Sequence, residues 1–178
     1  MRIEVICLRR SVLNLMGLLI VVLIYGALAS EGLLLREADY AASYGRQVLF
    51  QWDSDSSSGV SMAAWRAARK GTERAIELLP SSPVYQDQLA YLYILRARQT
   101  PDQGLSKIFY SEAANRSLVS LKLRPQHGWA WAMYAEELSG LGLDPCDAMV
   151  QAKHRAPYEM GVASVLQNRS LNGMHCSE

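Results

Sequence analysis

The longest apolar stretch of the chain runs from Val12 to Ala29 and contains no Asp, Glu, Lys, Arg or His. Its one strongly polar residue is Asn14. In a helix that rises about 1.5 Å per residue, a run of this length crosses most of the hydrocarbon core of a bilayer. The pattern therefore predicts a transmembrane helix over residues 12–29, preceded by a short N-terminal segment over residues 1–11.

The charges on either side of this stretch predict its orientation. Three arginines and one acid precede it, and the first charged residue after it is acidic: Arg2, Arg9, Arg10 and Glu4 before, Glu31 after. By the positive-inside rule, residues 1–11 are expected in the cytoplasm and the rest of the chain outside it. The alternative is a cleaved secretory signal, because Ala27-Leu28-Ala29 has the small-x-small pattern of a cleavage site. A retained anchor is favoured, since the apolar part of a cleaved signal is usually about 7 to 15 residues long.

Helical spacing of apolar residues continues from Leu33 to Trp52, until the polar run from Asp53 to Gly59 predicts a break. No segment alternates apolar and polar residues between hairpin turns, so a sheet is not expected. The prediction is an all-α protein with one N-terminal transmembrane helix. Its exported part divides into three segments. Residues 30–58 form a helical stalk that ends in a polar hinge, residues 59–168 form a helical domain, and residues 169–178 form a C-terminal tail.

Prolines mark the ends of successive helical stretches in the predicted helical domain. Ala-rich helical stretches end near Pro80, Pro125 and Pro157, and each is followed by another helical pattern. This resembles the tetratricopeptide repeat, a pair of antiparallel helices of about 34 residues with small residues where the helices touch. The expected close-approach residues are alanines, namely Ala68, Ala75, Ala90, Ala113 and Ala135. The spacing between the prolines is irregular, so the repeats are degenerate, and an unrelated helical bundle is the alternative.

A narrower resemblance rests on two segments, ARKGTERAIELLPSSPVYQDQLAYLYILRAR and RSLVSLKLRPQHGWAWAMYAEEL. Together with the plan of the N-terminus, they resemble VpsP-type proteins of bacterial exopolysaccharide biosynthesis. The resemblance covers roughly residues 64 to 166 and implies one membrane segment followed by an exported, repeat-like helical part. It implies a pathway, and it transfers no catalytic residue to this chain.

The net charge and the cysteine content limit the binding partners and the compartment that can be expected for this chain. The formal net charge is +1, from 18 basic and 17 acidic residues, which gives no field of the kind that nucleic-acid binding requires. Cys7 falls on the predicted cytoplasmic side, whereas Cys146 and Cys176 fall outside, where an oxidising compartment permits a disulfide between them. The alternative that both are unpaired stays open, because sequence alone does not show whether the two sulfur atoms meet.

Aromatic residues gather in the first helices of the two clearest repeats. Tyr93 and Trp131 stand at helix-interior positions and are assigned to the core. Tyr85, Trp129 and Tyr134 are the surface candidates, which could stack on sugar rings or anchor a partner helix.

Two acids, Glu136 and Glu137, follow the tryptophans and could contact a sugar beside them. The competing interpretation is a solvated helix face. The histidines, His127, His154 and His175, lack the spacing of a metal site, and no metal or cofactor is predicted. No enzymatic activity is predicted either, because a glycoside hydrolase would need a second carboxylate across a cleft.

These observations together predict a single-pass protein of a bacterial inner membrane with a periplasmic helical-repeat domain. Such repeats bind through an extended surface, so the expected function is that of an accessory or scaffold in exopolysaccharide biosynthesis or export. Its partners would be protein components of that complex, and the polysaccharide itself is a further candidate. The alternatives are a general cell-envelope adaptor that binds peptides and a carbohydrate-active enzyme that uses Glu136 or Glu137.

Overall fold

The computed structural model describes residues 2–54, 59–163 and 176, and the side chains of residues 16–52, 59–163 and 176. These residues form helices and turns, and no strand occurs among them. The predicted all-α class is confirmed. The chain forms two compact units, Met1–Glu37 and Ala38–Glu178.

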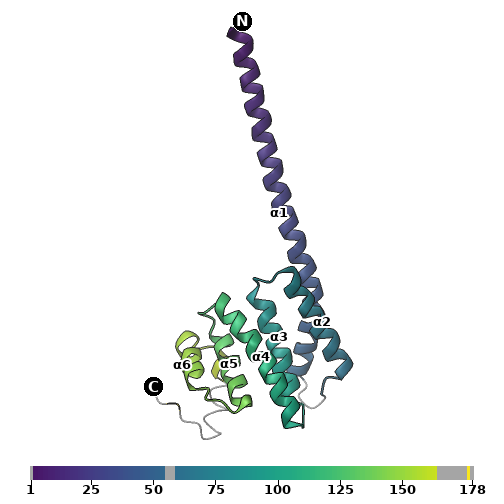
Figure 1. Ribbon diagram of the computed structural model, residues 1–178, viewed down its shortest axis with the longest axis vertical. Coiled ribbons are helices and arrows are strands. Elements are labelled where there is room, and N and C mark those ends of the chain that lie inside the picture. The colour runs from purple at the N-terminus through teal and green to yellow at the C-terminus, as the bar shows by residue number, and fades with distance from the viewer. Residues whose placement is uncertain (1, 55–58, 164–175, 177–178) are drawn as a thin grey trace. The chain divides into compact units, whose positions relative to one another are not determined.

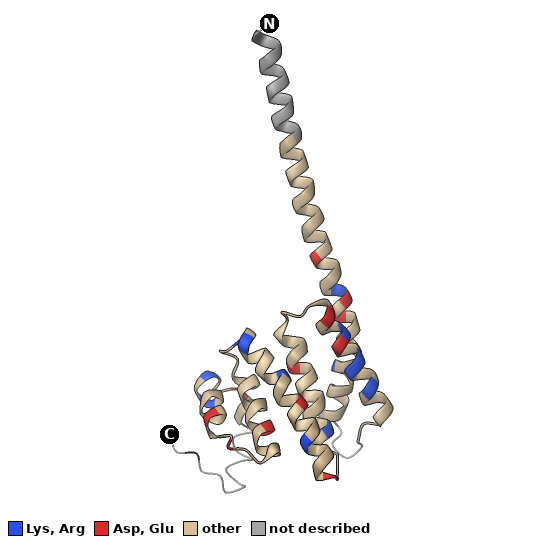
Figure 2. Cartoon of the chain, in the orientation of Figure 1, with Lys and Arg blue, Asp and Glu red and all other residues tan. Residues whose placement is uncertain are grey.

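The first unit consists of the first part of helix α1 (Arg2–Ser54). Its large apolar side chains, from Met16 to Leu35, are all exposed. Residues 16–30 of α1 contain no Asp, Glu, Lys or Arg, and Figure 2 accordingly draws this stretch in tan. By length and composition, α1 is a candidate membrane-spanning helix, as the sequence predicts.

The second unit contains the last part of α1 and a series of shorter helices. They are α2 (Met62–Leu78), α3 (Pro83–Arg98), α4 (Gln103–Leu123), α5 (Gly128–Leu141) and α6 (Cys146–Arg155). Each helix from α2 to α5 packs against the next one, and α3 also touches α5 (Figure 1). The connections are short, at 79–82, 99–102, 124–127 and 142–145, so consecutive helices run antiparallel. A further helical turn covers 160–163.

Local sequence explains where these helices begin and end. Ser61 and Asp102 cap α2 and α4, because their side chains accept hydrogen bonds from backbone amides three residues later. Pro83 occupies the first turn of α3, where its missing amide proton is not needed. Gly142 ends α5 in the left-handed conformation, with φ of 80°, and the amide of Leu143 donates to the Leu138 carbonyl. This is a Schellman motif, for which glycine is the favoured residue.

The main core lies among α1, α2, α3 and α4. Trp65 of α2 is 4% exposed and packs edge-on against Tyr93 of α3 and Phe109 of α4. Its indole nitrogen donates to the Leu92 carbonyl at 3.0 Å. Tyr93 is buried, which confirms its assignment to the core. Helix α3 is central, since 11 of its 16 residues are buried.

Small residues occupy the helix contacts, as the repeat pattern predicts. All five close-approach alanines are at most 1% exposed: Ala68, Ala75, Ala90, Ala113 and Ala135. Two glycines allow even closer approach. A Cβ on Gly71 of α2 would lie 2.4 Å from the Ala41 carbonyl of α1, and one on Gly140 would enter the Tyr110 ring. Larger side chains at these positions would push the helices apart.

The structure differs from the predicted division at residues 30–58. Residues 38–54 belong to the compact helical unit, because Ala38, Ala42, Val48 and Trp52 are buried in its core. The helical domain therefore begins near residue 38 rather than at residue 59. Of the predicted hinge, residues 55–58 lie outside the described residues, as does the predicted tail except for Cys176.

The hairpins also depart from the standard repeat length. The pair α3–α4 spans residues 83–123 and the pair α5–α6 spans 128–155, against about 34 residues in a tetratricopeptide unit. The excess in the first pair lies in α4, which has 21 residues, and not in the turn at 99–102.

Candidate functional site

Tyr85 is not on the surface, so its prediction as an exposed binding residue is wrong. It is 3% exposed and packs with Ala38, Ala42 and Ala75. Its hydroxyl donates to Asp39 Oδ1 at 3.2 Å, and burial, together with this carboxylate, raises the pKa of Tyr85. The residue holds α3 against the last part of α1.

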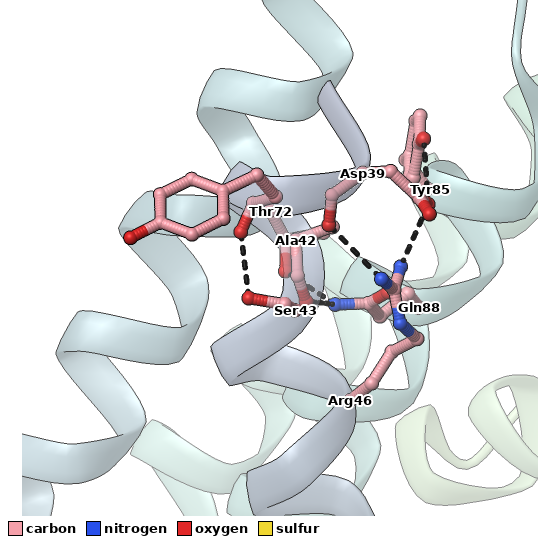
Figure 3. A network of polar contacts seen from close by, with 8 residues as sticks. Asp39, Ala42, Ser43, Arg46, Thr72, Tyr85 and Gln88 are labelled. Atoms are coloured by element: carbon pink, nitrogen blue, oxygen red, sulfur yellow. Dashed lines mark hydrogen bonds and ion pairs between the residues drawn. The ribbon is translucent and has the colours of Figure 1, made fainter. Parts of the chain in front are cut away.

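Figure 3 shows the polar network around this contact. Arg46 donates to the side chain and the carbonyl of Asp39, at 3.1 and 2.9 Å. The buried amide of Gln88 donates to the Ala42 carbonyl at 3.0 Å and to Thr72 Oγ1 at 2.8 Å, which links three helices. A Cβ on the facing Gly45 would lie 2.3 Å from this amide nitrogen, so glycine makes room for it. The network is structural, because it fixes residues 38–54 of α1 to α2 and α3.

The two acids of α5 are buried, and neither forms the solvated face or the exposed sugar contact that the sequence suggested. Glu136 is 8% exposed and forms a two-pronged ion pair with Arg98 of α3, with N–O distances of 2.7 and 2.6 Å. Glu137 is fully buried, and Ser117 of α4 donates to its Oε1 at 2.7 Å. Helix periodicity could have revealed this, since Glu137 shares a face with Ala130 and Met133, both buried.

Glu137 has an unusual environment for a carboxyl group. Its second oxygen, Oε2, has no hydrogen-bond partner, and burial raises the pKa of the group well above its usual value of 4.5. The nearby charges of Glu136 and Asp87 raise it further. A neutral, protonated carboxyl group is therefore the favoured form of Glu137 over an extended pH range.

Replacing Glu137 by glutamine is expected to change how stability depends on pH. Between 4.5 and the raised pKa, the folded protein holds a proton that the unfolded chain releases. The free energy of unfolding of the native protein therefore falls as pH rises through this window. Glutamine does not titrate, so the variant should gain stability relative to the native protein as pH rises. Urea denaturation from pH 5 to pH 9 checks this, with Glu112→Gln as the control.

The control residue, Glu112, is an exposed acid on α4. The Glu112→Gln variant should show a pH profile of the unfolding free energy that is parallel to that of the native protein. A parallel profile for Glu137→Gln as well would contradict the protonated state inferred for Glu137.

Sequence reasoning missed a second polar cluster, at the turn between α4 and α5. Arg124 Nη2 donates to Asp87 Oδ2 of α3 at 2.6 Å and lies 3.0 Å from His127 Nδ1. Because arginine only donates, this contact favours the neutral ring of His127 with its proton on Nε2, in which Nδ1 accepts. Burial lowers the pKa of His127, and Arg124 lowers it further. Burial also raises the pKa of Asp87 despite this arginine. The cluster ties the α4–α5 turn to α3.

The aromatic residues of α5 divide into two groups, all half-buried. Trp129 packs edge-on against Tyr91, with ring centres 6.0 Å apart. Gly161 lies close to the Trp129 ring. Trp131 contacts Tyr134 at 6.4 Å, with ring planes 70° apart. Trp129, Trp131 and Tyr134 each keep part of their surface accessible, so Trp131 is less buried than the core assignment predicted.

Trp131 is held by polar contacts as well as by packing. Its indole nitrogen donates to the Pro125 carbonyl at 2.8 Å, and the Arg155 guanidinium of α6 lies 5.4 Å from its ring centre. We define the aromatic ledge as Trp131, Tyr134 and Leu138, which follow one another at helical spacing on α5. Of the predicted binding residues, Trp129 and Tyr134 remain candidates.

The pairing of cysteines that the sequence left open is made in the structure. Cys146, the first residue of α6, forms a disulfide with Cys176, with Cα atoms 5.3 Å apart. Cys176 packs on the cluster of Ala135, Ala148 and Met149, which the aromatic ledge borders. The disulfide thus joins two positions 30 residues apart, beside a cluster that half-buried residues of α5 border.

A shallow polar pocket of about 320 Å³ lies between the start of α4 and the end of α5. Hydroxyl, amide and ammonium groups line it: Thr100, Gln103, Ser106, Lys107 and Ser139, with Gly140 and Gly142. The hydroxyls of Thr100 and Ser106 already donate to backbone carbonyls. Among the described residues, no group of histidine, cysteine and acidic side chains is arranged to hold a metal ion, and His175 lies outside them.

No family model matches the chain, and no curated protein matches it either.

Proposed function

We propose that this chain is a single-pass inner-membrane protein with its helical domain on the periplasmic side, where it acts as an accessory or scaffold of exopolysaccharide assembly or export. The observation that carries the location is the Cys146–Cys176 disulfide, because such bonds persist in oxidising compartments and are rare in the cytosol. The arginines before the apolar stretch favour the same orientation. Two independent features thus support one topology.

Support for a scaffold comes from the architecture. An array of antiparallel helices presents a broad surface assembled from successive hairpins, and such arrays bind other macromolecules. Half-buried aromatic residues of the kind found in the aromatic ledge are enriched at protein interfaces. The exopolysaccharide pathway comes from the resemblance of residues 64 to 166 to VpsP-type proteins.

Topology can be tested with reporters fused after Glu178. A phosphatase that is active only outside the cytoplasm should be active, and a reporter that fluoresces only in the cytoplasm should be dark. As a control, replacing Arg9 and Arg10 by glutamate should reduce the phosphatase signal, because it removes most of the charge asymmetry. A fluorescent cytoplasmic fusion with the native sequence would reverse the proposed topology.

The same material shows whether the anchor is retained. We expect the mature N-terminus to be that of the full chain, because the apolar stretch exceeds the usual length of a cleaved signal. An N-terminal sequence beginning at Ser30 would contradict this, although the location of the domain would stand.

The scaffold role can be tested by crosslinking the full-length protein in its membrane and identifying what co-purifies. Components of a polysaccharide assembly complex should be recovered, and Tyr134→Ala with Trp129→Ala should reduce their yield. A deletion strain should lose exopolysaccharide while other envelope proteins assemble normally. A general envelope defect would favour the adaptor alternative instead.

A further inference from the structure

The polar pocket between the start of α4 and the end of α5 combines one cationic side chain with several uncharged polar groups. Lys107 supplies an ammonium group and Gln103 an amide, and the other polar side chains of the lining are hydroxyls. None of the lining residues is acidic, and none carries a large apolar side chain. Such a lining suits a hydrophilic ligand that bears a negative charge.

Two hydroxyl groups of the pocket have already used their own protons. Thr100 donates to the Arg96 carbonyl at 2.8 Å, and Ser106 donates to the Ala97 carbonyl at 3.0 Å. Each hydroxyl oxygen keeps lone pairs, so toward a ligand it acts as an acceptor. A ligand that matches these two oxygens must therefore present hydrogen-bond donors. An anion that consists of acceptor oxygens alone matches them poorly.

The two helix ends beside the pocket favour the same division between a negative group and donor groups. Gln103 is the first residue of α4, and this end of a helix carries a partial positive charge. Gly140 lies in the last turn of α5, where backbone carbonyls lack partners within the helix and carry a partial negative charge. The α4 side therefore favours a negative group, and the α5 side favours hydrogen-bond donors.

The acids within three sequence positions of the lining residues make other contacts. Asp102 and Asp144 each accept a hydrogen bond from a nearby backbone amide, at 2.8 and 3.0 Å. Both acids of α5 are buried, and one of them is paired with Arg98. Among the residues that the structure describes, none forms an ion pair with Lys107. Its ammonium group is thus the charge that a ligand meets in the pocket.

We propose that this pocket binds a uronic acid residue of a polysaccharide, that is, a sugar whose ring carries both a carboxylate and hydroxyl groups. The carboxylate binds Lys107, and ring hydroxyls donate to the oxygens of Thr100 and Ser106. The volume of about 320 Å³ is at the lower end of the range of small-molecule sites, about 300 to 1,000 Å³, which suits a single sugar residue. This inference names the ligand within the proposed exopolysaccharide role and rests on that role.

Binding is measured on the full-length protein in detergent by saturation-transfer NMR titration. The acidic probes are methyl glucuronoside and methyl galacturonoside, which differ in the orientation of one hydroxyl. Their neutral counterparts are methyl glucoside and methyl galactoside, in which a hydroxymethyl group replaces the carboxylate. At least one acidic sugar should bind, with a Kd about tenfold lower than that of its neutral counterpart. An equal concentration of inorganic phosphate should not displace it.

Lys107→Gln tests the site itself, because it removes the charge and keeps a polar side chain. It should raise the Kd of the acidic sugar about tenfold and leave that of the neutral sugar unchanged. Lys122→Gln is the matched control, since Lys122 is an exposed lysine in the last turn of the same helix, and it should change neither value. Thr100→Val removes an acceptor and should weaken binding of acidic and neutral sugars alike.

Failure of both acidic sugars to bind would overturn the inference. Equal affinity of the native protein and Lys107→Gln, or an equal loss with Lys122→Gln, would also overturn it by removing the binding from this pocket. Displacement by phosphate would show a general anion site and overturn the assignment to a sugar. The proposed function fails separately, if a deletion strain makes normal exopolysaccharide. Loss of exopolysaccharide in that strain without sugar binding contradicts only this inference.

Discussion

Replacing Trp65 by alanine is expected to destabilise the helical unit more than any other single change proposed here, by about 3 to 5 kcal/mol. The indole is 4% exposed and contacts rings on two other helices, with ring centres 5.8 and 5.5 Å away. Its removal would leave a cavity where α2, α3 and α4 meet, and would also remove the hydrogen bond to the Leu92 carbonyl. Urea denaturation of a fragment that begins at Ala38 measures the loss.

Trp131 provides the matched control, because it is a tryptophan of the same unit that is only half-buried. Trp131→Ala should cost about 1 to 2 kcal/mol, since less apolar surface returns to water. Trp65→Phe keeps an aromatic ring but removes the indole N–H, so it separates the contribution of packing from that of the hydrogen bond. This variant should recover most of the stability that Trp65→Ala loses. Equal costs for Trp65→Ala and Trp131→Ala would show that the core is not centred on Trp65.

The second large effect is expected from Ala90→Leu on α3. Ala90 is fully buried in the central helix, so three added carbon atoms must displace neighbouring side chains or backbone. Overpacking of this kind costs about 1 to 3 kcal/mol. At an exposed helix position, the same replacement changes helix propensity by only a few tenths of a kcal/mol. Chemical denaturation of the fragment that begins at Ala38 distinguishes the cost expected at a buried position from that expected at an exposed one.

Ala67→Leu is the control for this replacement, because Ala67 is exposed and its neighbour Ala68 is the contact residue. It should leave the free energy of unfolding nearly unchanged. If both leucine variants leave the free energy of unfolding equally unchanged, then Ala90 is not closely packed, and the register proposed for the repeats is wrong.

Features that depend on neighbouring residues in the sequence could be predicted well. The helices end near the prolines because the missing amide proton and the restricted preceding residue are local effects. The contact alanines could be placed because their spacing follows the helical period. The class of the fold and the antiparallel hairpins came from these two signals alone.

The errors concern residues whose partners are distant in the sequence. Tyr85 bonds to Asp39 across 46 positions, and Arg98 pairs with Glu136 across 38. No periodicity within one helix reveals such a partner, so the sequence alone does not predict that Tyr85 and Glu136 are buried. Burial of a charged group requires a partner, and the partner can be recognised only once the helices are assembled.

The position of Ala38 shows that the residues that determine export lie outside the folded helical unit. It is the first buried residue of the helical unit, and it comes nine residues after Ala29, the end of the possible cleavage motif. A peptidase that cut there would release a chain with every core side chain still attached. Secretion into the surrounding space and retention at the membrane would therefore produce the same folded domain, and a change of a few residues near Ala27 could exchange one fate for the other without altering its packing.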